Sequence, residues 1–243
     1  MNRSHAIDVI NKLIKADRES PKRILVIGDA MTDMYVHGHL YETCQEGCPK
    51  FVQENCVSVP GGAANALQTL KHWFVSKDSV FDQNLGPIKV RFMRGEKCIW
   101  RYDNDIHTKY LYDIIEAMVL AKIDNFQPDA VLISDYDKGF ITPQIIRRTI
   151  DACSLLHIPC VADMKRKRDI YHGAITKANV QWEDKFGGAR VITRGDYWPM
   201  VDGMYAADSD FTLQPVRCVN HVGAGDCFAA HLTLALAHGF SLK

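Results

Sequence analysis

The sequence has no uninterrupted apolar run as long as the roughly 18 residues that a membrane-spanning helix needs. Its N-terminal stretch has an amphipathic helical pattern, with leucine and isoleucine side chains between Ile7 and Ile14 on one face. This stretch lacks the apolar block of a signal peptide. We therefore predict a cytoplasmic protein without a membrane partner.

No charge of one sign is in excess. Lys plus Arg and Asp plus Glu each total 29 among the 243 residues, so the chain lacks the overall basic field typical of proteins that bind nucleic acid. We predict no nucleic-acid partner and expect any small anionic ligand to be held by local chemistry. The one basic run, at residues 165–168, lies next to Asp163 and could face phosphate groups, but such a run is more typical of a solvated loop.

A Cys-x-x-Cys pair is absent, although the chain has eight cysteines. Most of them lie within apolar runs, where a free cysteine behaves as a small core residue. The one cluster consists of Cys44, Cys48 and Cys56, and a metal there is the less favoured interpretation. Internal repeats, linkers and low-complexity segments are also lacking, and we predict one domain that spans residues 1–243.

Four short apolar runs have the character of buried strands, at residues 23–28, 130–134, 158–162 and 190–193. Between them lie helical patterns, at 112–126 and after Thr142, an N-cap residue followed by proline. Apolar strands that alternate with helices predict an α/β fold with a mostly parallel central sheet covered on both faces. A ligand is then expected at the carboxyl ends of these strands.

Two stretches interrupt this alternation, at about 35–59 and 88–102. They carry Tyr, Val, Phe and Ile among polar residues without a helical period. The second stretch has the pattern of a hairpin that turns at Arg94-Gly95. We predict a small β lid, inserted beside the α/β core and lying over its strand ends.

The strongest local signal is Val222-Gly-Ala-Gly-Asp226, which opens a helical run rich in small residues and stopped by Gly239. The turn leaves backbone N–H groups at the positive end of a helix dipole, an arrangement that binds phosphate oxygens. Asp226 could take a proton from a hydroxyl while these N–H groups stabilise a transferring phosphoryl group. Taken alone, a tight turn with an ordinary Asp at a helix start explains the motif equally well.

Two further stretches suit a ligand with several hydroxyl groups. From Pro60 to Asn65, paired glycines allow close approach of the backbone, and the Asn65 amide offers a donor and an acceptor. From Gly28 to Asp33, the Asp33 carboxylate follows the first strand and could bind a pair of sugar hydroxyls. The alternative for Asp33 is simple capping.

Taken together and in this order, the motifs resemble those of the ribokinase-like (PfkB) carbohydrate kinases. The matching motifs are Gly28-Asp29 with Asp33, Gly61-Gly62 with Asn65, residues 134–139, and Gly223 to Asp226. The resemblance extends from about Arg23 to the end of the chain and is greatest to the heptose 7-phosphate kinases of lipopolysaccharide precursor synthesis. It implies a three-layer sandwich with a β lid, ATP and Mg²⁺ as cofactors, and, by analogy alone, a homodimer formed through the lid.

The resemblance also implies roles for individual residues. Asp226 is the expected catalytic base, and the expected anion hole is made by the amides of Gly223, Ala224 and Gly225. The expected sugar-binding residues are Asp33, Gly61, Gly62 and Asn65, with Lys138 near the sugar's phosphate. Asn179 matches the asparagine of an Asn-x-x-Glu motif that helps to place magnesium and phosphates. The nucleotide side is expected to be lined by Thr193, Arg194 and Gly195.

The sequence departs from the family pattern in four ways. The segment 73–87 is short of a β-α-β portion, so the fold is expected to be shortened. The motif glutamate is replaced by Trp182, with Glu183 one position later, which leaves the magnesium ligands unassigned. Asn220 replaces an Asp that begins the terminal motif, and we do not expect a monovalent-cation site. The sequence ends at Lys243, before the helices that wall the adenine pocket in the family.

The sequence features suggest three functions. The favoured one is ATP-dependent phosphoryl transfer to a hydroxyl of a sugar or sugar phosphate, with a heptose 7-phosphate-type substrate implied by the resemblance. The alternative is a non-catalytic ribokinase-like protein that binds a sugar phosphate or serves a regulatory partner. A nucleotidyltransferase, suggested by His37-Gly38-His39, is disfavoured because its His-x-Gly-His motif begins a helix and the context here is that of a strand.

Overall fold

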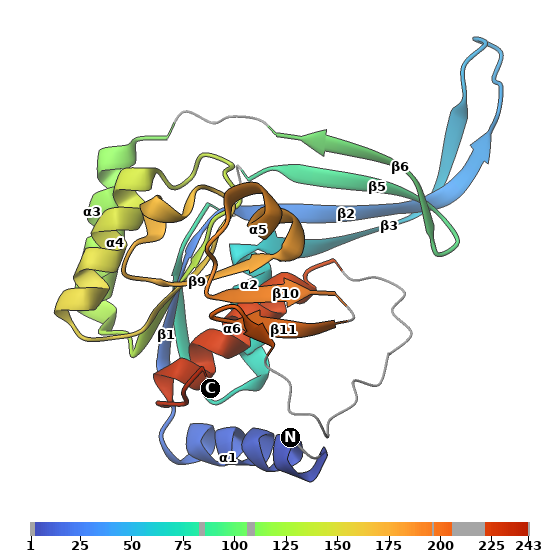
Figure 1. Cartoon of the computed structure of the whole chain (residues 1–243). Coiled ribbons are helices and arrows are strands. Elements are labelled where there is room, and N and C mark those ends of the chain that lie inside the picture. Colours follow the sequence, from blue (N-terminus) through green and yellow to red (C-terminus); the bar gives the residue numbers. More distant parts are fainter. Residues whose placement is uncertain (1–2, 83–85, 106–109, 196, 206–221, 243) are drawn as a thin grey trace.

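The larger of two sheets forms the body of the protein. The computed structural model describes residues 3–82, 86–105, 110–195, 197–205 and 222–242. Within these residues the larger sheet has the strand order β12-β11-β10-β9-β8-β7-β1-β4 (Figure 1). The strands from β10 to β4 run parallel, and β11 and β12 add an antiparallel hairpin at one edge. The strand bounds are β1 Arg23–Gly28, β4 Ser76–Val80, β7 Ala130–Ser134, β8 Cys160–Asp163, β9 Ile175–Asn179, β10 Val191–Arg194, β11 Tyr197–Val201 and β12 Met204–Tyr205.

The predicted strands agree closely with the observed ones. The predictions for β1 and β7 match residue for residue. β8 begins two residues late, at Cys160, because Pro159 has no N–H to donate to a neighbouring strand. β10 begins one residue late, since the Arg190 N–H is donated to the Thr176 hydroxyl at 3.1 Å.

Helices cover both faces of this sheet, which confirms the predicted three-layer α/β sandwich (Figure 1). Successive residues of β1 point to opposite sides, so that Leu25 and Ile27 join one core while Ile24 and Val26 join the other. The core of Leu25 is closed by α3 (Tyr112–Phe126) and α4 (Pro143–Leu155), and the core of Ile24 by α2 (Ala63–Thr69) and α6 (Ala224–Ala237). Thr142 caps α4 as predicted, because its hydroxyl accepts the Ile145 N–H at 3.2 Å.

The remaining helical elements lie at the margins of the body. They are α1 (Arg3–Glu19), α5 (Val180–Phe186) and two short 3₁₀ turns, η1 (Leu70–His72) and η2 (Arg168–Tyr171). The predicted amphipathic helix is α1, but its apolar stripe packs on the core only through Leu13, while Ile7 and Ile10 are exposed. None of the helices in the described ranges is long and apolar enough to cross a membrane.

The smaller sheet is the predicted lid. Its strands are β2 (Ala30–Tyr41), β3 (Lys50–Gly62), β5 (Ile88–Arg94) and β6 (Lys97–Asn104), in the order β3-β2-β5-β6. β2 and β5 pair in parallel, and the other pairs are antiparallel. The strands are longer than the predicted stretches 35–59 and 88–102, chiefly because β2 already begins at Ala30. His37-Gly38-His39 lies inside β2, in the strand context that disfavoured a nucleotidyltransferase.

The two faces of the lid differ in chemistry. Asp33 is in register with Lys89, and Lys89 with Asp103, so these charged side chains share one face. That face is turned to the body, since the Lys89 ammonium lies over the Tyr136 ring at 5.3 Å from its centre. The alternate residues of these strands lie on the opposite, outer face, where Val90 pairs with Tyr102 and Phe92 with Trp100.

The lid grows directly out of β1, the strand next to the edge strand β4 of the larger sheet. Only Gly28 and Asp29 stand at the junction of β1 and β2, and Gly28 has φ +148°. A side chain at Gly28 would overlap the Ser134 carbonyl of the neighbouring strand, so glycine is required there. On the other side of β1, the shortened segment 73–87 contributes the strand β4 at the edge of the described sheet.

Candidate active site

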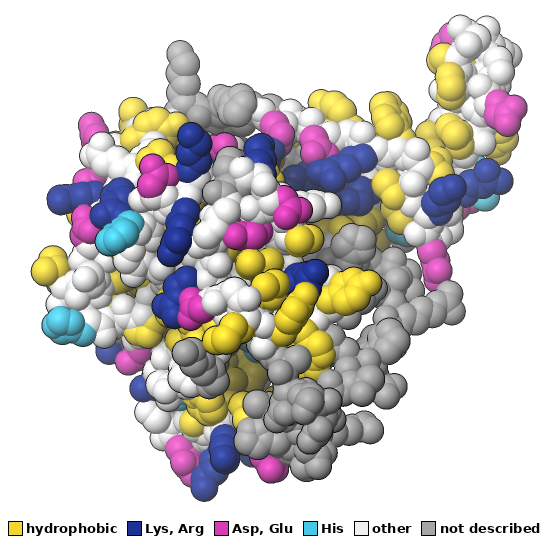
Figure 2. Space-filling model, in the orientation of Figure 1, with side chains coloured by type: hydrophobic (Ala, Val, Ile, Leu, Met, Phe, Trp, Pro, Cys, Tyr) yellow, Lys and Arg dark blue, Asp and Glu magenta, His cyan; other side chains and the backbone are white. Residues whose placement is uncertain are grey.

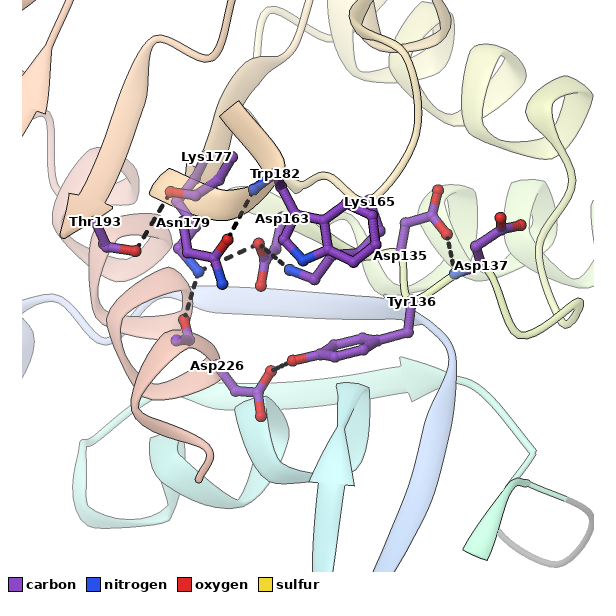
Figure 3. Close-up of polar contacts among 12 residues, drawn as sticks. Asp135, Tyr136, Asp137, Asp163, Lys165, Lys177, Asn179, Trp182, Thr193 and Asp226 are labelled. Carbon is purple, nitrogen blue, oxygen red and sulfur yellow. Dashed lines mark hydrogen bonds and ion pairs between the residues drawn. The ribbon is translucent and has the colours of Figure 1, made fainter. Parts of the chain in front are cut away.

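Asp226 lies buried in the first turn of α6, with 3% of its surface exposed. Its Oδ2 accepts a hydrogen bond from the Asn65 side-chain amide at 3.0 Å. Its Oδ1 accepts one from the Tyr136 hydroxyl at 2.7 Å, as Figure 3 shows. Three elements distant in sequence therefore meet at this carboxylate: α2, the loop after β7, and α6. Tyr136 lies in the stretch 134–139 quoted for the family resemblance, but the sequence assigned it no role.

Burial governs the proton affinity of this pair. It raises the pKa of Asp226 above its usual range, although the hydrogen bonds from Asn65 and Tyr136 act in the opposite direction. It also raises the pKa of Tyr136 well above its usual value, and the Asp226 charge adds to this effect. Tyr136 therefore stays a hydrogen-bond donor, and Asp226 is a stronger base than an exposed carboxylate.

The turn before α6 has the conformation that its glycines predict. Gly223 is the N-cap residue with φ +84°, and a side chain there would overlap the Asn65 amide. The first N–H groups of any helix lack intrahelical acceptors, so those around Ala224 and Gly225 are placed for an anion beside Asp226. Asn220 and His221, which depart from the family pattern, and Lys243 lie outside the described residues.

A second buried carboxylate lies between two lysines at the ends of β8 and β9. Asp163 Oδ1 is 3.0 Å from the Lys165 ammonium and 3.2 Å from the Lys177 ammonium. Lys177 also donates to the Gly225 carbonyl at 3.2 Å, which links this group to the start of α6 (Figure 3). Asp163 Oδ2 is buried and has no hydrogen-bond partner among the described residues. A buried carboxylate oxygen of this kind is suited to a hard cation or a water molecule.

The basic run 165–168 is thus only partly the solvated loop that the sequence favoured. Lys165 is buried, with its ammonium 4.9 Å from the centre of the Tyr136 ring and 5.9 Å from that of Trp182. Arg166 is half-buried and pairs with Asp135 at 2.9 Å. The prediction of a solvated loop is wrong for these two residues because each pairs with a buried carboxylate, Lys165 with Asp163 at the end of β8 and Arg166 with Asp135 after β7.

Asn179 and Glu183 both serve the backbone around α5. The Asn179 side chain accepts the Trp182 N–H at 3.1 Å and so caps the helix. The Glu183 carboxylate accepts the N–H groups of Gly188 at 2.6 Å and Ala189 at 2.8 Å. Glu183, one position beyond the expected motif glutamate, therefore has both carboxylate oxygens engaged by this loop.

The three residues predicted for the nucleotide side separate in the structure. The Thr193 hydroxyl donates to the Ala178 carbonyl at 3.3 Å, beside Asn179 (Figure 3). Arg194 instead points to the edge of the sheet, where it donates to the Tyr205 hydroxyl at 2.9 Å and lies over the Tyr197 ring. Gly195 follows in the turn to β11, with φ +64°.

The residues predicted for the sugar lie where the lid meets the body. Asp33 is buried and forms an ion pair of 2.6 Å with Arg91 of β5. A side chain at Gly61 would press against the Asp33 carboxylate, so glycine keeps this surface open. The Lys138 ammonium is 2.6 Å from Asp105. Figure 2 shows a row of Lys and Arg side chains on the visible side of this junction.

Asp29 organises the loop that carries Tyr136. It is fully buried, and its carboxylate accepts the N–H groups of Tyr136, Lys138 and Phe140 at 2.8 to 3.1 Å. Burial raises the pKa of Asp29, while these hydrogen bonds act to lower it. Asp29 thereby positions the loop. It belongs to one of the motifs that resemble the family, but no role was predicted for it.

A cavity of about 560 Å³ joins several of these groups. It is lined at one end by Asp33, Asn65 and Gly223, and it extends to Trp73 and His231. Three motifs distant in sequence therefore border one space large enough for a small molecule.

Comparison with curated proteins finds distant relatives. No protein-family model matches the sequence. The chain is 26% identical to the bifunctional protein HldE of Koribacter versatilis over 276 aligned positions, which cover 90% of this chain and 56% of the relative. It is 27% identical to HldE of Hyphomonas neptunium over 190 positions, covering 65% and 39% of the two chains. The chain thus spans about half the length of the curated relatives it matches.

Solved structures identify the fold. A ribokinase of Arabidopsis thaliana, in complex with ribose and ATP, superposes with a TM-score of 0.59 at 13% identity, covering 91% of this chain and 88% of the ribokinase. The tetrameric inhibited form of phosphofructokinase-2 from Escherichia coli gives a TM-score of 0.60 at 18% identity, with 91% and 89% covered. The chain therefore has the ribokinase-like fold of the PfkB carbohydrate kinases and is distantly related to the HldE proteins.

Proposed function

We propose that this protein transfers the γ-phosphoryl group of ATP to a hydroxyl of a sugar or sugar phosphate. The observation that carries the proposal is the buried Asp226 carboxylate at the N-terminal turn of α6, held by Asn65 and Tyr136. Asp226 takes the proton of the attacking hydroxyl, and the N–H groups around Gly223, Ala224 and Gly225 stabilise the charge on the phosphoryl group.

The nucleotide is assigned to the ends of β8, β9 and β10. Lys165 and Lys177 supply positive charge for its phosphates beside Asp163. Asn179, Thr193 and Gly195 border the nucleotide side, and Arg194, which points to the sheet edge, is assigned to its rim.

Among the buried carboxylates near the assigned nucleotide site, Asp163 has an oxygen suited to Mg²⁺. Asp163 Oδ2 is a hard oxygen without a partner among the described residues, whereas the Glu183 carboxylate is occupied by backbone N–H groups. We assign Asp163 as the residue that would hold the ion. A bound Mg²⁺ would supply positive charge that neutralises the nucleotide phosphates.

The acceptor is assigned to the junction of lid and body. Asp33, Asn65 and the open surface at Gly61 and Gly62 suit sugar hydroxyls. Lys138 and the half-buried Lys89 suit a phosphate on the acceptor, which favours a heptose 7-phosphate-type substrate. Burial lowers the pKa of Lys89, an effect that a bound phosphate would offset.

The test is an ADP-release assay with Mg-ATP against heptose 7-phosphate, fructose 6-phosphate, ribose and adenosine. We expect one acceptor to be phosphorylated and Asp226→Asn to lower turnover by roughly two to four orders of magnitude, since the variant keeps the shape but loses the base. Thermal unfolding of the variant serves as the control for folding. Equal, background-level ADP release from both proteins over the whole panel would reject the kinase.

One observation favours a second candidate function. The glutamate of the Asn-x-x-Glu motif is replaced by Trp182, and both oxygens of the neighbouring Glu183 accept backbone N–H groups. A non-catalytic protein that binds a sugar phosphate would tolerate the loss of this glutamate. Calorimetry separates the two, because a kinase binds Mg-ATP and the non-catalytic protein binds the sugar phosphate alone.

A further inference from the structure

The outer end of the lid is a two-stranded ribbon that lacks support from the rest of the sheet. β5 pairs with β2 only as far as His37, whereas β2 and β3 continue together to Tyr41 and Lys50. Figure 1 shows this end of the hairpin projecting away from the body. An isolated two-stranded hairpin is marginally stable in water, so the ribbon needs a further contribution to order its tip.

Three metal-ligating side chains converge at that tip, in the turn between β2 and β3. The side chains of Cys44, Glu46 and Cys48 place their donor atoms within 4.8 Å of one another. The turn is closed by hydrogen bonds of 2.9 Å from the Cys44 N–H to the Cys48 carbonyl and from the Gly47 N–H to the Cys44 carbonyl. Gly47 has φ +76°, which lets the chain double back so that both thiols lie on one side.

The separations of the donor atoms fit a tetrahedral ion. The Cys44 and Cys48 sulfurs are 3.4 Å apart, and the Cys44 sulfur is 3.8 Å from Glu46 Oε2. Zinc–sulfur bonds of about 2.3 Å and zinc–oxygen bonds of about 2.1 Å require edges of roughly 3.8 and 3.6 Å in a tetrahedron. The observed distances lie within a few tenths of an ångström of those edges.

The chemistry of the three donors also favours a cation. The Cys44 thiol lies within hydrogen-bonding distance of both the Cys48 sulfur and the Glu46 carboxylate, and a cation bound among them would take the place of the thiol protons. A disulfide would use only the two sulfurs and would gain nothing from the carboxylate. Paired thiolates select soft or borderline ions, and two sulfurs with one oxygen in a tetrahedral arrangement are suited to Zn²⁺.

We propose that Cys44, Glu46 and Cys48 form a Zn²⁺ site that staples the tip of the lid hairpin. Water completes the coordination. The site is separate from the candidate active site and does not depend on the proposed kinase activity. Cys56, which the sequence grouped with Cys44 and Cys48, is not a ligand, because it lies on β3 opposite Val36, within the supported part of the hairpin.

Titration of reduced, metal-free protein with Co²⁺ and then Zn²⁺ tests the site. We expect about one equivalent of Co²⁺ to give the visible absorption of tetrahedral thiolate coordination, and Zn²⁺ to displace it. Cys44→Ser and Cys48→Ser should each weaken binding more than about tenfold, and Glu46→Gln should weaken it less. Cys56→Ser, another exposed cysteine of the same hairpin, is the matched control and should bind as the wild type does.

Hydrogen exchange supplies a second measurement that does not depend on the metal spectrum. Zn²⁺ should slow amide exchange across residues 38–53 in the wild type and in Cys56→Ser, but not in Cys44→Ser. Cobalt binding that is unchanged in Cys44→Ser and Cys48→Ser would overturn the proposal. So would a reduced wild type that binds neither ion, whether or not mass spectrometry then finds a Cys44–Cys48 disulfide in air.

Discussion

At the scale of single residues, the hydroxyl of Tyr136 controls the state of Asp226. It donates to Oδ1 at 2.7 Å, and burial raises its own pKa well above the usual value, so it remains protonated. Its hydrogen bond lowers the pKa of Asp226 against the larger, opposite effect of burial. The balance leaves a carboxylate that is more basic than usual and held in one orientation.

Tyr136→Phe removes this hydrogen bond and keeps the ring. Because the bond lowers the pKa of Asp226, its loss raises that pKa, and the ionised base is then populated only at higher pH. We expect the acidic limb of the kcat profile to move up by about one pH unit, so that kcat falls by up to about tenfold on that limb and little above it, with KM nearly unchanged.

The pH dependence of kcat measures this effect in both proteins. Tyr171→Phe is the matched control, since Tyr171 makes a similar buried hydrogen bond, of 2.6 Å, to Asp135 rather than to Asp226. A Tyr136→Phe profile that falls equally at every pH, with its acidic limb unmoved, would contradict the role of Tyr136.

At the scale of elements, α1 is attached to the body by its last turn. Asp17 is fully buried, and its Oδ2 accepts the Phe74 N–H at 2.7 Å, in the segment after η1. Its Oδ1 lies 3.4 Å from Nε2 of His238, just past the end of α6. One carboxylate thus joins three elements, while much of the apolar stripe of α1 stays exposed.

Asp17→Ala should therefore destabilise the fold. The change leaves the Phe74 N–H without its acceptor, which costs about 1–3 kcal/mol in the free energy of unfolding. Urea denaturation measures the difference. Glu19→Ala, at an exposed position in the same turn, should change stability by less than about 0.5 kcal/mol. Equal stabilities for the two variants would refute the anchoring role of Asp17.

Elements with a strong local pattern were predictable from the sequence. The uniformly apolar run of β7 and the helical period of α3 gave their bounds residue by residue. The start of β2 was not predicted, because the polar residues from Asp29 to Asp33 resemble a ligand-binding loop more than a strand. They form a strand because β3 and β5 supply hydrogen bonds along its length.

The candidate site was predictable where each motif carries its own geometry. The Gly-Ala-Gly turn places Asp226 at a helix start, and Asn65 follows paired glycines in the same way. The group around Asp163 was missed, since Lys177 belongs to a different strand and meets it only in the folded sheet. A lysine in the middle of the short strand-like stretch Ile175–Asn179 was the signal that could have indicated it.

At the scale of the whole molecule, the outer face of the lid exposes aromatic side chains. Trp100 is 63% exposed and Tyr102 is 51% exposed on this face, and the Trp100 ring stacks on Phe92. Exposed aromatic side chains on a sheet face are typical of an interface. We propose that a second copy of the chain covers it, in agreement with the homodimer that the family resemblance implies.

Trp100→Glu should prevent this association. A charge in the middle of the aromatic face costs desolvation that the dimer cannot offset. We expect the wild type to sediment as a dimer at micromolar concentration and the variant as a monomer. Leu155→Lys is the control, because Leu155 is 81% exposed on α4 of the body and should leave the dimer intact. A monomeric wild type, or a dimeric Trp100→Glu, would exclude an interface on this face.

The junction between β1 and β2 has a mechanical consequence. The lid leaves β1 at Gly28 and Asp29, and the Asp29 carboxylate also accepts the backbone N–H of Tyr136. The pivot of the lid and the anchor of the tyrosine are therefore the same residue. If the lid tilts about this pivot and displaces Asp29, the Tyr136 side chain is displaced with it. The hydrogen bond from the Tyr136 hydroxyl to the Asp226 carboxylate then changes as well. In the proposed kinase, the position of the lid at the acceptor and the basicity of Asp226 are therefore coupled through Asp29.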